Sequence, residues 1–213
     1  NSKEYILFSI DPSNFKKYKC KKTQKARYNR DSSGSFISHT FVLSSIIIED
    51  MCIPFKKIIY EGKKGISKPI IYQKLSRKFE KIDINGLKRI AVFDGEGCTK
   101  KNLPYFNKSV DWHGFITKFP KTRCITLNDK RIHIKKYLES LKESDFVKSD
   151  LSYYHWFQAE VPSLSFLGKC NLLVLLDDLK DLNNKSQVRV LITDILDLPL
   201  EEFLNIYAKR WKQ

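Results

Sequence analysis

The sequence of 213 residues is poor in cysteine, and its cysteines are widely spaced. The five form no Cys-x-x-Cys motif and no cluster with histidine, which excludes a zinc knuckle and a disulfide framework. We therefore expect free thiols, as is usual in a reducing cytoplasm. These cysteines are Cys20, Cys52, Cys98, Cys124 and Cys170.

Long apolar runs, a signal-peptide pattern, internal repeats and low-complexity tracts are also missing. No run approaches the ~18 residues that a membrane span needs, so we expect neither a membrane protein nor a secreted one. The first residue is Asn rather than Met, and we expect a fragment with sequence missing upstream. Hydrophobic residues make up 42% of the chain, enough for the core of one large domain or one domain with an insertion.

Charge is abundant and unevenly placed. The formal net charge is +15, with basic residues concentrated in 1–30 and 56–89 and acidic ones in 171–202. A polarised basic surface suggests a polyanionic partner such as nucleic acid. A generally lysine-rich composition explains the same excess, so the charge alone leaves both explanations open.

Apolar runs and helical spacing predict the elements of the first half of the chain. Residues 5–11 form an apolar run that Pro12 should stop, and 12–35 should be a loop or an ordered arm. Ser67 and Pro69 are typical of a helix start. The expected order is strands 5–11, 36–48 and 53–60, the last two antiparallel, a helix from 67, strand 89–94, helix 99–109 and strand 112–119.

The order of the predicted strands and helices changes in the second half of the chain. We expect an insertion, largely β, over 120–187, and then a return to the first fold. The predicted domain division is accordingly 1–119, 120–187 and 188–213. The elements expected here are helix 131–141, strands 153–162, 171–176 and 187–193, and helix 199–213.

Three meandering strands followed by helix, strand, helix, strand describe an α/β fold of the RNase H-like type, a mixed sheet with helices on both faces. A flavodoxin-like chain would place a helix directly after its first strand, and none is visible there.

Two acids end strands that this topology makes parallel neighbours. Asp11 follows the first strand and Asp94 the strand after the first helix, so their carboxylates should converge at one edge. Such oxygens suit Mg²⁺ or Mn²⁺, which activates water and stabilises the oxygens of a phosphodiester. A single such Asp is more often a turn former, and Glu96 fits a solvated loop acid.

The segment LEEFLNIYAKRW, after VRVLITDILDLP, resembles the signature helix of insertion-sequence transposases with a DDE active site. That signature reads Tyr-x-x-Arg-x-x-x-Glu with a later Lys. Tyr207 and Arg210 match its first two positions, and its Glu falls one residue after Gln213. The stretches ILFSID and RIAVFDGEG…WHGFITKF are similar to the family around its first two acids, so the resemblance covers most of the chain.

The resemblance implies a DNA transposase: Asp11 and Asp94 would hold Mg²⁺ (or Mn²⁺), cleave double-stranded DNA at the transposon end and transfer the strand to target DNA. It further implies a homodimer on paired ends and a prokaryotic, nucleoid-associated protein of the cytoplasm. Tyr207 and Arg210 would contact the terminal phosphates. The alternatives are that Tyr207 packs against the sheet and that Arg210 forms a surface ion pair.

Further DNA contacts have ordinary structural alternatives. Trp156 of the insertion is the candidate for stacking a flipped base, although an aromatic residue at such a position is more often part of the core. The helix face with Lys74, Arg77, Lys78 and Lys81 either tracks DNA phosphates or is simply solvated. Two other functions stay open: a different RNase H-like nuclease such as a junction resolvase, and a transposase-derived DNA-binding protein without catalysis.

Overall fold

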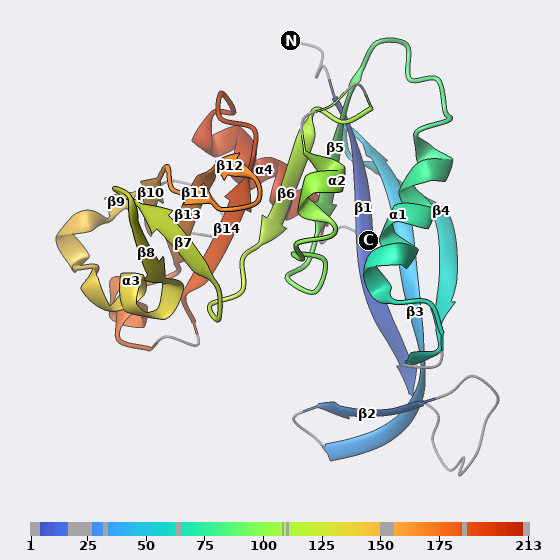
Figure 1. Cartoon of the computed structure of the whole chain (residues 1–213), viewed down its shortest axis with the longest axis horizontal. Coiled ribbons are helices and arrows are strands. Elements are labelled where there is room, and N and C mark those ends of the chain that lie inside the picture. Colours follow the sequence, from blue (N-terminus) through green and yellow to red (C-terminus); the bar gives the residue numbers. More distant parts are fainter. Residues whose placement is uncertain are drawn as a thin grey trace.

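The computed structural model describes residues 5–16, 27–31, 34–62, 65–107, 109, 111–149, 156–184 and 187–210. The fold is mixed α/β, built on one large mixed sheet with few helices (Figure 1). The ten-stranded sheet has the order β2-β3-β1-β5-β6-β14-β13-β10-β9, and β4 pairs with β3 beside this path.

The main sheet divides into two regions. In the first region β1, β5 and β6 are parallel, while β3 runs antiparallel to β1. From β6 onward every pairing is antiparallel. The strands of the first region are β1 (Tyr5–Lys16), β2 (Arg27–Asp31), β3 (Gly34–Ile48), β4 (Met51–Tyr60), β5 (Lys88–Phe93) and β6 (Gly114–Lys118). Those of the second are β9 (Val147–Lys148), β10 (Trp156–Glu160), β13 (Asn171–Leu176) and β14 (Arg189–Thr193).

A small second sheet has the order β12-β11-β7-β8 and lies beside the second region of the main sheet, near α3 (Figure 1). Its strands are β7 (Cys124–Leu127), β8 (Lys130–His133), β11 (Ser163–Leu164) and β12 (Gly168–Lys169). The helices are α1 (Lys68–Phe79), α2 (Leu103–Phe106), α3 (Ile134–Ser140) and α4 (Leu200–Lys209), with 3₁₀ turns at Glu143–Asp145 and Leu179–Leu182.

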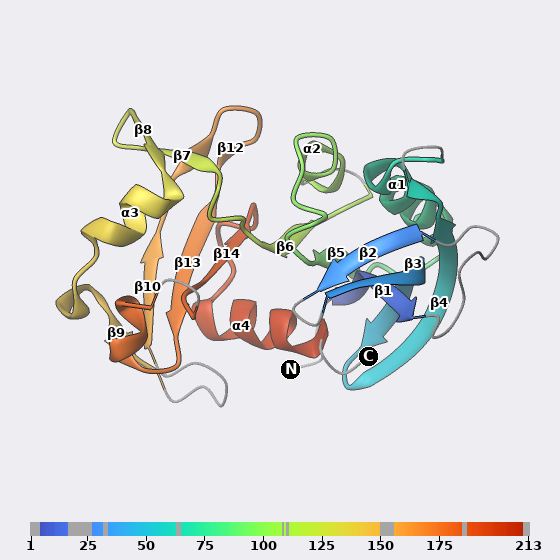
Figure 2. The same cartoon turned by 90° about the horizontal axis from the view of Figure 1, so that it is seen from below.

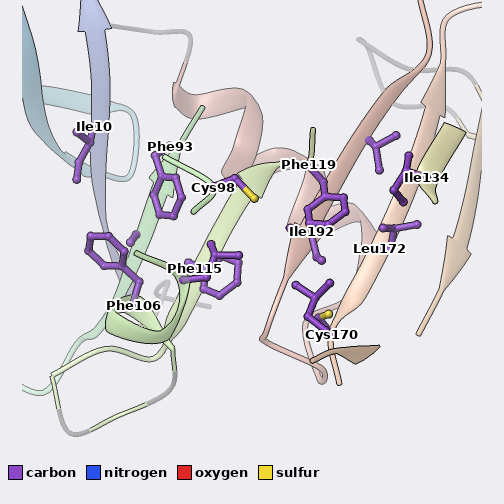
Figure 3. Packing of buried hydrophobic residues seen from close by; sticks show 14 of the residues in the cluster. Ile10, Phe93, Cys98, Phe106, Phe115, Phe119, Ile134, Cys170, Leu172 and Ile192 are labelled. Carbon is purple, nitrogen blue, oxygen red and sulfur yellow. The ribbon is translucent and has the colours of Figure 1, made fainter. Parts of the chain in front are cut away.

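Alternating apolar residues give the main sheet two buried faces. Along β1, Ile6, Phe8 and Ile10 join one core cluster while Leu7 joins the other, as the period of two requires. The first cluster contains residues of α1, α2 and α3, and Figure 3 shows part of it. The second contains residues of α4, which runs across the other face (Figure 2). The expectation of helices on both faces is confirmed.

The hairpin expected from 36–48 and 53–60 is confirmed, as antiparallel β3 and β4. The expected end of the first strand at Pro12 is wrong. β1 continues to Lys16 by pairing with β3. Beyond Ile10 its pairing with β5 has ended, so one edge of β1 is open there and tolerates a proline. The segment 12–35, expected to be a loop or arm, also contributes β2.

The second half differs from expectation in two ways. The helix expected over 131–141 begins only at Ile134, because Lys130–His133 forms β8 against β7. The stretch 120–187 is largely β as expected, yet its β13 and β10 extend the main sheet.

In the first half of the chain, the helix expected over 99–109 is limited to α2. None of the helices formed by described residues is long and apolar enough to cross a bilayer.

Candidate active site

Asp11 and Asp94 lie at the same point of two parallel neighbouring strands, which confirms the expected adjacency of β1 and β5. The last residues that pair between these strands are Ile10 and Phe93, and each acid is the next residue of its chain. By the alternation of each strand, both acids continue the face that α4 covers. The sequence predicted Asp11 at the end of the first strand. In the structure β1 continues past Asp11, and β5 is the strand that ends beside it.

A buried arginine from the last helix contacts Asp11. Arg210 Nη1 donates to Asp11 Oδ1 at 3.0 Å, and the side-chain exposures are 2% for Arg210 and 37% for Asp11. The guanidinium also lies over the ring of Tyr207, 5.2 Å from its centroid. The position predicted for a phosphate contact is therefore beside the carboxylates, and in this structure it forms an ion pair with one of them.

The ionisation of Asp11 reflects opposing influences. Burial raises the pKa of its carboxyl above the ordinary value, and the charge and hydrogen bond of Arg210 oppose that rise. The negative charges of Asp94 and Glu96 raise the same pKa further. The charges of Asp94 and Glu96 therefore disfavour ionisation of Asp11, and a divalent cation would offset them.

Helix α4 is fixed at both ends, which sets the position of Arg210. Near its start, Tyr5 Oη donates to Glu202 Oε1 at 2.6 Å. At its end, Lys209 Nζ donates to the carbonyl of Glu49 in the turn between β3 and β4. Between them the apolar face of α4 packs on the sheet through the buried Phe203, Leu204, Ile206 and Tyr207. The helix thus leads from β14 toward β1 (Figure 2).

The turn after β5 carries Asp94 and is held by close packing. Gly97 N donates to the carbonyl of Asp94 at 2.8 Å, and Thr117 Oγ1 donates to the same oxygen at 3.3 Å. A Cβ on Gly97 would lie 2.5 Å from ring atoms of both Phe93 and Tyr72, so only glycine fits there.

Tyr72 is a residue of this region that sequence reasoning missed. Its side chain is fully buried, and within the described structure its hydroxyl has no hydrogen-bond partner. Burial raises the pKa of this phenol, as do the charges of Glu96, Asp11 and Asp94. It belongs to the apolar stripe of α1, so only its polar tip distinguishes it in the sequence from the neighbouring Ile71 and Leu75.

The other acids near the site have partners or lie elsewhere. Glu96 is paired with Lys68 and is half exposed, consistent with a loop acid. Asp194 follows β14, which is antiparallel to β6, so it lies at the opposite edge and accepts from Phe115 N at 2.8 Å. Among the residues that the structure describes, no three acids, histidines or cysteines are grouped as a metal site would require.

Two predicted DNA contacts lie within or against the core. Tyr207 is 3% exposed and belongs to the cluster under α4. Trp156 is partly buried against the other cluster, on β10, far along the strand order from β1. The structure thus places Trp156 on the opposite face from Asp11 and does not bring it to the site.

The basic residues predicted on α1 do come together. Lys74, Arg77, Lys78 and Lys81 are exposed, and they line a pocket of about 370 Å³ with Lys56 and Ile58 of β4. Five cationic side chains around one apolar residue make a strongly positive groove. Lys56 was not predicted, because only the pairing of β4 with β3 brings it beside α1. The groove lies on the face opposite Asp11, the face of the α1 cluster.

Comparison with known proteins gives a structural likeness. A piggyBac transposase, solved by cryo-EM as a synaptic complex with hairpin DNA, matches with a TM-score of 0.56 and 10% sequence identity. The alignment covers 96% of this chain and 37% of that one, so the chain spans little more than a third of its length. Family models give no match, and neither do curated proteins. At this identity the likeness shows a transposase-like fold and nothing finer.

Proposed function

We propose that the chain is the catalytic core of a DNA transposase of the insertion-sequence DDE type, with an RNase H-like fold. The observation that carries the proposal is the juxtaposition of Asp11 and Asp94 on parallel neighbouring strands, on one face, beside the end of α4. The signature resemblance predicts that same convergence, and the structural likeness to a transposase supports it.

The strand order supports the fold assignment. Read from the edge, β4-β3-β1-β5-β6 holds a meander of three strands followed by two parallel strands, with α1 and α2 on one face and α4 on the other. We retain the division into a core over 1–119, an insertion over 120–187 and a return segment over 188–213. In this division the strands β10 and β13 of the insertion widen the main sheet.

The two carboxylates fit a divalent cation of the Mg²⁺ or Mn²⁺ class as two of its ligands. Both are hard oxygen donors, both are partly open to solvent, and the repulsion that acts on Asp11 favours a cation there. When bound, such an ion supplies an activated water and stabilises charge on phosphodiester oxygens. Asp11 and Asp94 would hold it, and Arg210 would then be placed to offer its planar fork to a phosphate instead.

The signature that the chain resembles places a Glu four residues after its Arg, which on a helix is one turn further along. On a helix, residues three or four apart share one face, so a Glu one residue after Gln213 would complete the set of acids. That Glu is a prediction of the resemblance. The homodimer on paired transposon ends is likewise proposed on the resemblance.

The charge supports duplex DNA as the substrate. The groove formed by Lys56 and the basic face of α1 would neutralise backbone phosphates on the side of the sheet away from the carboxylates. Removing one phosphate contact should reduce the slope of log affinity against log salt by about 0.9. Lys74→Ala, Lys78→Ala and their combination test this contribution, and Lys142→Ala, in the second half of the chain, is the control.

The function is tested by metal binding and DNA cleavage together. Mn²⁺ titration calorimetry on this chain should show binding that Asp11→Asn and Asp94→Asn each abolish, whereas Asp177→Asn, an exposed acid at the end of β13, should leave it unchanged. In a cleavage assay the same two variants should lose cleavage of transposon-end DNA and keep DNA binding. Cleavage retained by either variant would refute the assignment. Duplex binding without any cleavage would instead identify a non-catalytic DNA-binding protein.

A further inference from the structure

Beyond the end of β5, strands β1 and β3 continue as a ribbon that carries aromatic side chains on the Asp11 face. The register pairs Asp11 with Leu43, Ser13 with Phe41 and Phe15 with His39. Since alternate residues share a face, these pairs follow Asp11 in successive rows on the same side. Figure 1 shows β1 and β3 extending past β5 and β6, with β2 paired to the far end of β3.

The aromatic residues form one connected group. The rings of Phe15 and Phe41 meet edge to face at 5.1 Å, and His39 lies 6.2 Å from Phe41. Lys57 of β4 extends over the ring of Phe41, with its ammonium 5.7 Å from the centroid. Phe15 is 53% exposed, although a phenylalanine on a strand usually packs into a core. The face therefore offers an open ring, Phe15, in contact with a second ring, Phe41, that carries a cation.

The ribbon is held by the pairing of β1 with β3 and by a polar contact on its other face. Thr40 Oγ1 donates to Asn14 Oδ1 at 2.6 Å on that side, and Thr40 is buried. Continuous pairing of β1 with β3 runs to Lys16. The ring of Phe15 is 53% exposed and meets Phe41 of the partner strand, so much of its surface stays open to a ligand.

We propose that Phe15, Phe41 and Lys57 form a base-stacking site for an unpaired nucleotide of the DNA strand that passes Asp11. The proposal rests on the proposed function. Phe15 lies four residues after Asp11 along the strand, a rise of about 13 Å, which corresponds to roughly four base steps of DNA. Stacking on an aromatic ring with a cation at the phosphate is the usual recognition of a single strand.

The chemistry of the face favours nucleic acid over a protein partner. The chain carries a net charge of +15, and the described groove on the other side of β4 is also cationic. A cation over an aromatic ring next to a pair of carboxylates suits a ligand with flat rings and negative charges. A second copy of this chain would bring the same positive charge to that face and be repelled.

The test compares DNA with and without bases. Fluorescence anisotropy would measure the affinity for a duplex with a short single-stranded extension, made either with bases or with abasic sites. The wild-type chain should bind the base-containing extension about 5- to 100-fold more tightly. Phe15→Ala should remove this preference and leave the abasic affinity unchanged, and Phe15→Trp should keep it, with quenched tryptophan fluorescence. Ile53→Ala, an exposed residue of β4, is the matched control.

The outcomes separate this inference from the proposed function. Equal affinity of the wild type for both DNAs, or a preference retained in Phe15→Ala, overturns the stacking site while duplex binding still supports the transposase. Failure to bind either DNA at low salt overturns both. A changed oligomeric state in Phe15→Ala with unchanged base preference shows that the ring is a protein interface. Thermal melting of each variant confirms that the ribbon is folded.

Discussion

Gly97 closes the turn that carries Asp94, and Gly97→Ala tests whether packing fixes that turn. The added Cβ would lie 2.5 Å from Phe93 Cδ2 and 2.5 Å from Tyr72 Cε2. The best carbon–carbon separation is about 3.5–4.0 Å, so the turn or the rings must move by about 1 Å. Both rings are completely buried in the core of α1 and β5, where neighbouring side chains leave no room for them to swing away.

The expected cost follows from overpacking, which typically destabilises a protein by about 1–3 kcal/mol. A loss of about 2 kcal/mol lowers the Tm of a chain of this size by roughly 4–8 °C. Because the turn also carries Asp94, a shift of about 1 Å should weaken Mn²⁺ binding and reduce cleavage by up to about 100-fold. Urea denaturation, thermal melting, Mn²⁺ titration and a cleavage assay measure these four effects.

Gly95→Ala is the control within the same turn. Its Cβ would come no closer than 3.4 Å, to the carbonyl of Lys118, and its backbone is not in the left-handed region. Its stability should stay equal to that of the wild type or rise by up to about 1 kcal/mol, because alanine restricts the unfolded chain. Equal stability and equal Mn²⁺ affinity of Gly95→Ala and Gly97→Ala would refute the claim that ring packing positions Asp94.

Three further predictions concern ionisation, packing and thiols. Burial raises the folded-state pKa of Asp11, so its contribution to stability is present below the ordinary value of 3.8 and is lost as pH rises through the raised pKa. In chelator, the stability of the wild type relative to Asp11→Asn should therefore be highest below pH 3.8 and fall as pH rises, and a difference between their urea midpoints that does not change with pH would contradict this. Trp112→Phe should cost about 2–3 kcal/mol, because the buried indole donates to Glu80 Oε1 at 2.8 Å; an unchanged urea midpoint would count against it. Burial raises the pKa of the Cys98 and Cys170 thiols to about 12, so both should react with a thiol reagent only as fast as the chain opens. Rapid labelling of either in the folded chain would contradict their burial.

The expectation of free cysteines agrees with the described part of the chain, in which Cys52, Cys98, Cys124 and Cys170 are all free. Cys20 lies outside the described residues, as do Trp211, Lys212 and Gln213 at the end of the predicted helix. The predicted strand 153–162 begins in the structure at Trp156, because residues 153–155 are likewise outside it.

The sequence by itself determined the elements whose signal is local. Period-two alternation and β-branched runs located β3, β4, β5 and β14, and the spacing of Ile71, Leu75 and Phe79 located α1. Asp11 and Asp94 were found because each follows a buried apolar run, and strand order then predicted their adjacency. Each of these inferences needs only neighbouring residues and a rule of topology.

Tertiary structure alone decided what depends on residues far apart in the chain. From the sequence alone, Pro12 predicts the end of a strand. β1 nevertheless continues, because β3 pairs with one of its edges and the pairing with β5 at the other edge has already ended. Likewise, residues 131–133 were predicted to be helical but form part of β8, because β8 pairs with β7. The contact of Arg210 with Asp11 joins positions 199 residues apart, and its strength depends on how far the packing of α4 excludes water. No local sequence pattern predicts the burial of Arg210, because that burial arises only when α4 packs over the sheet.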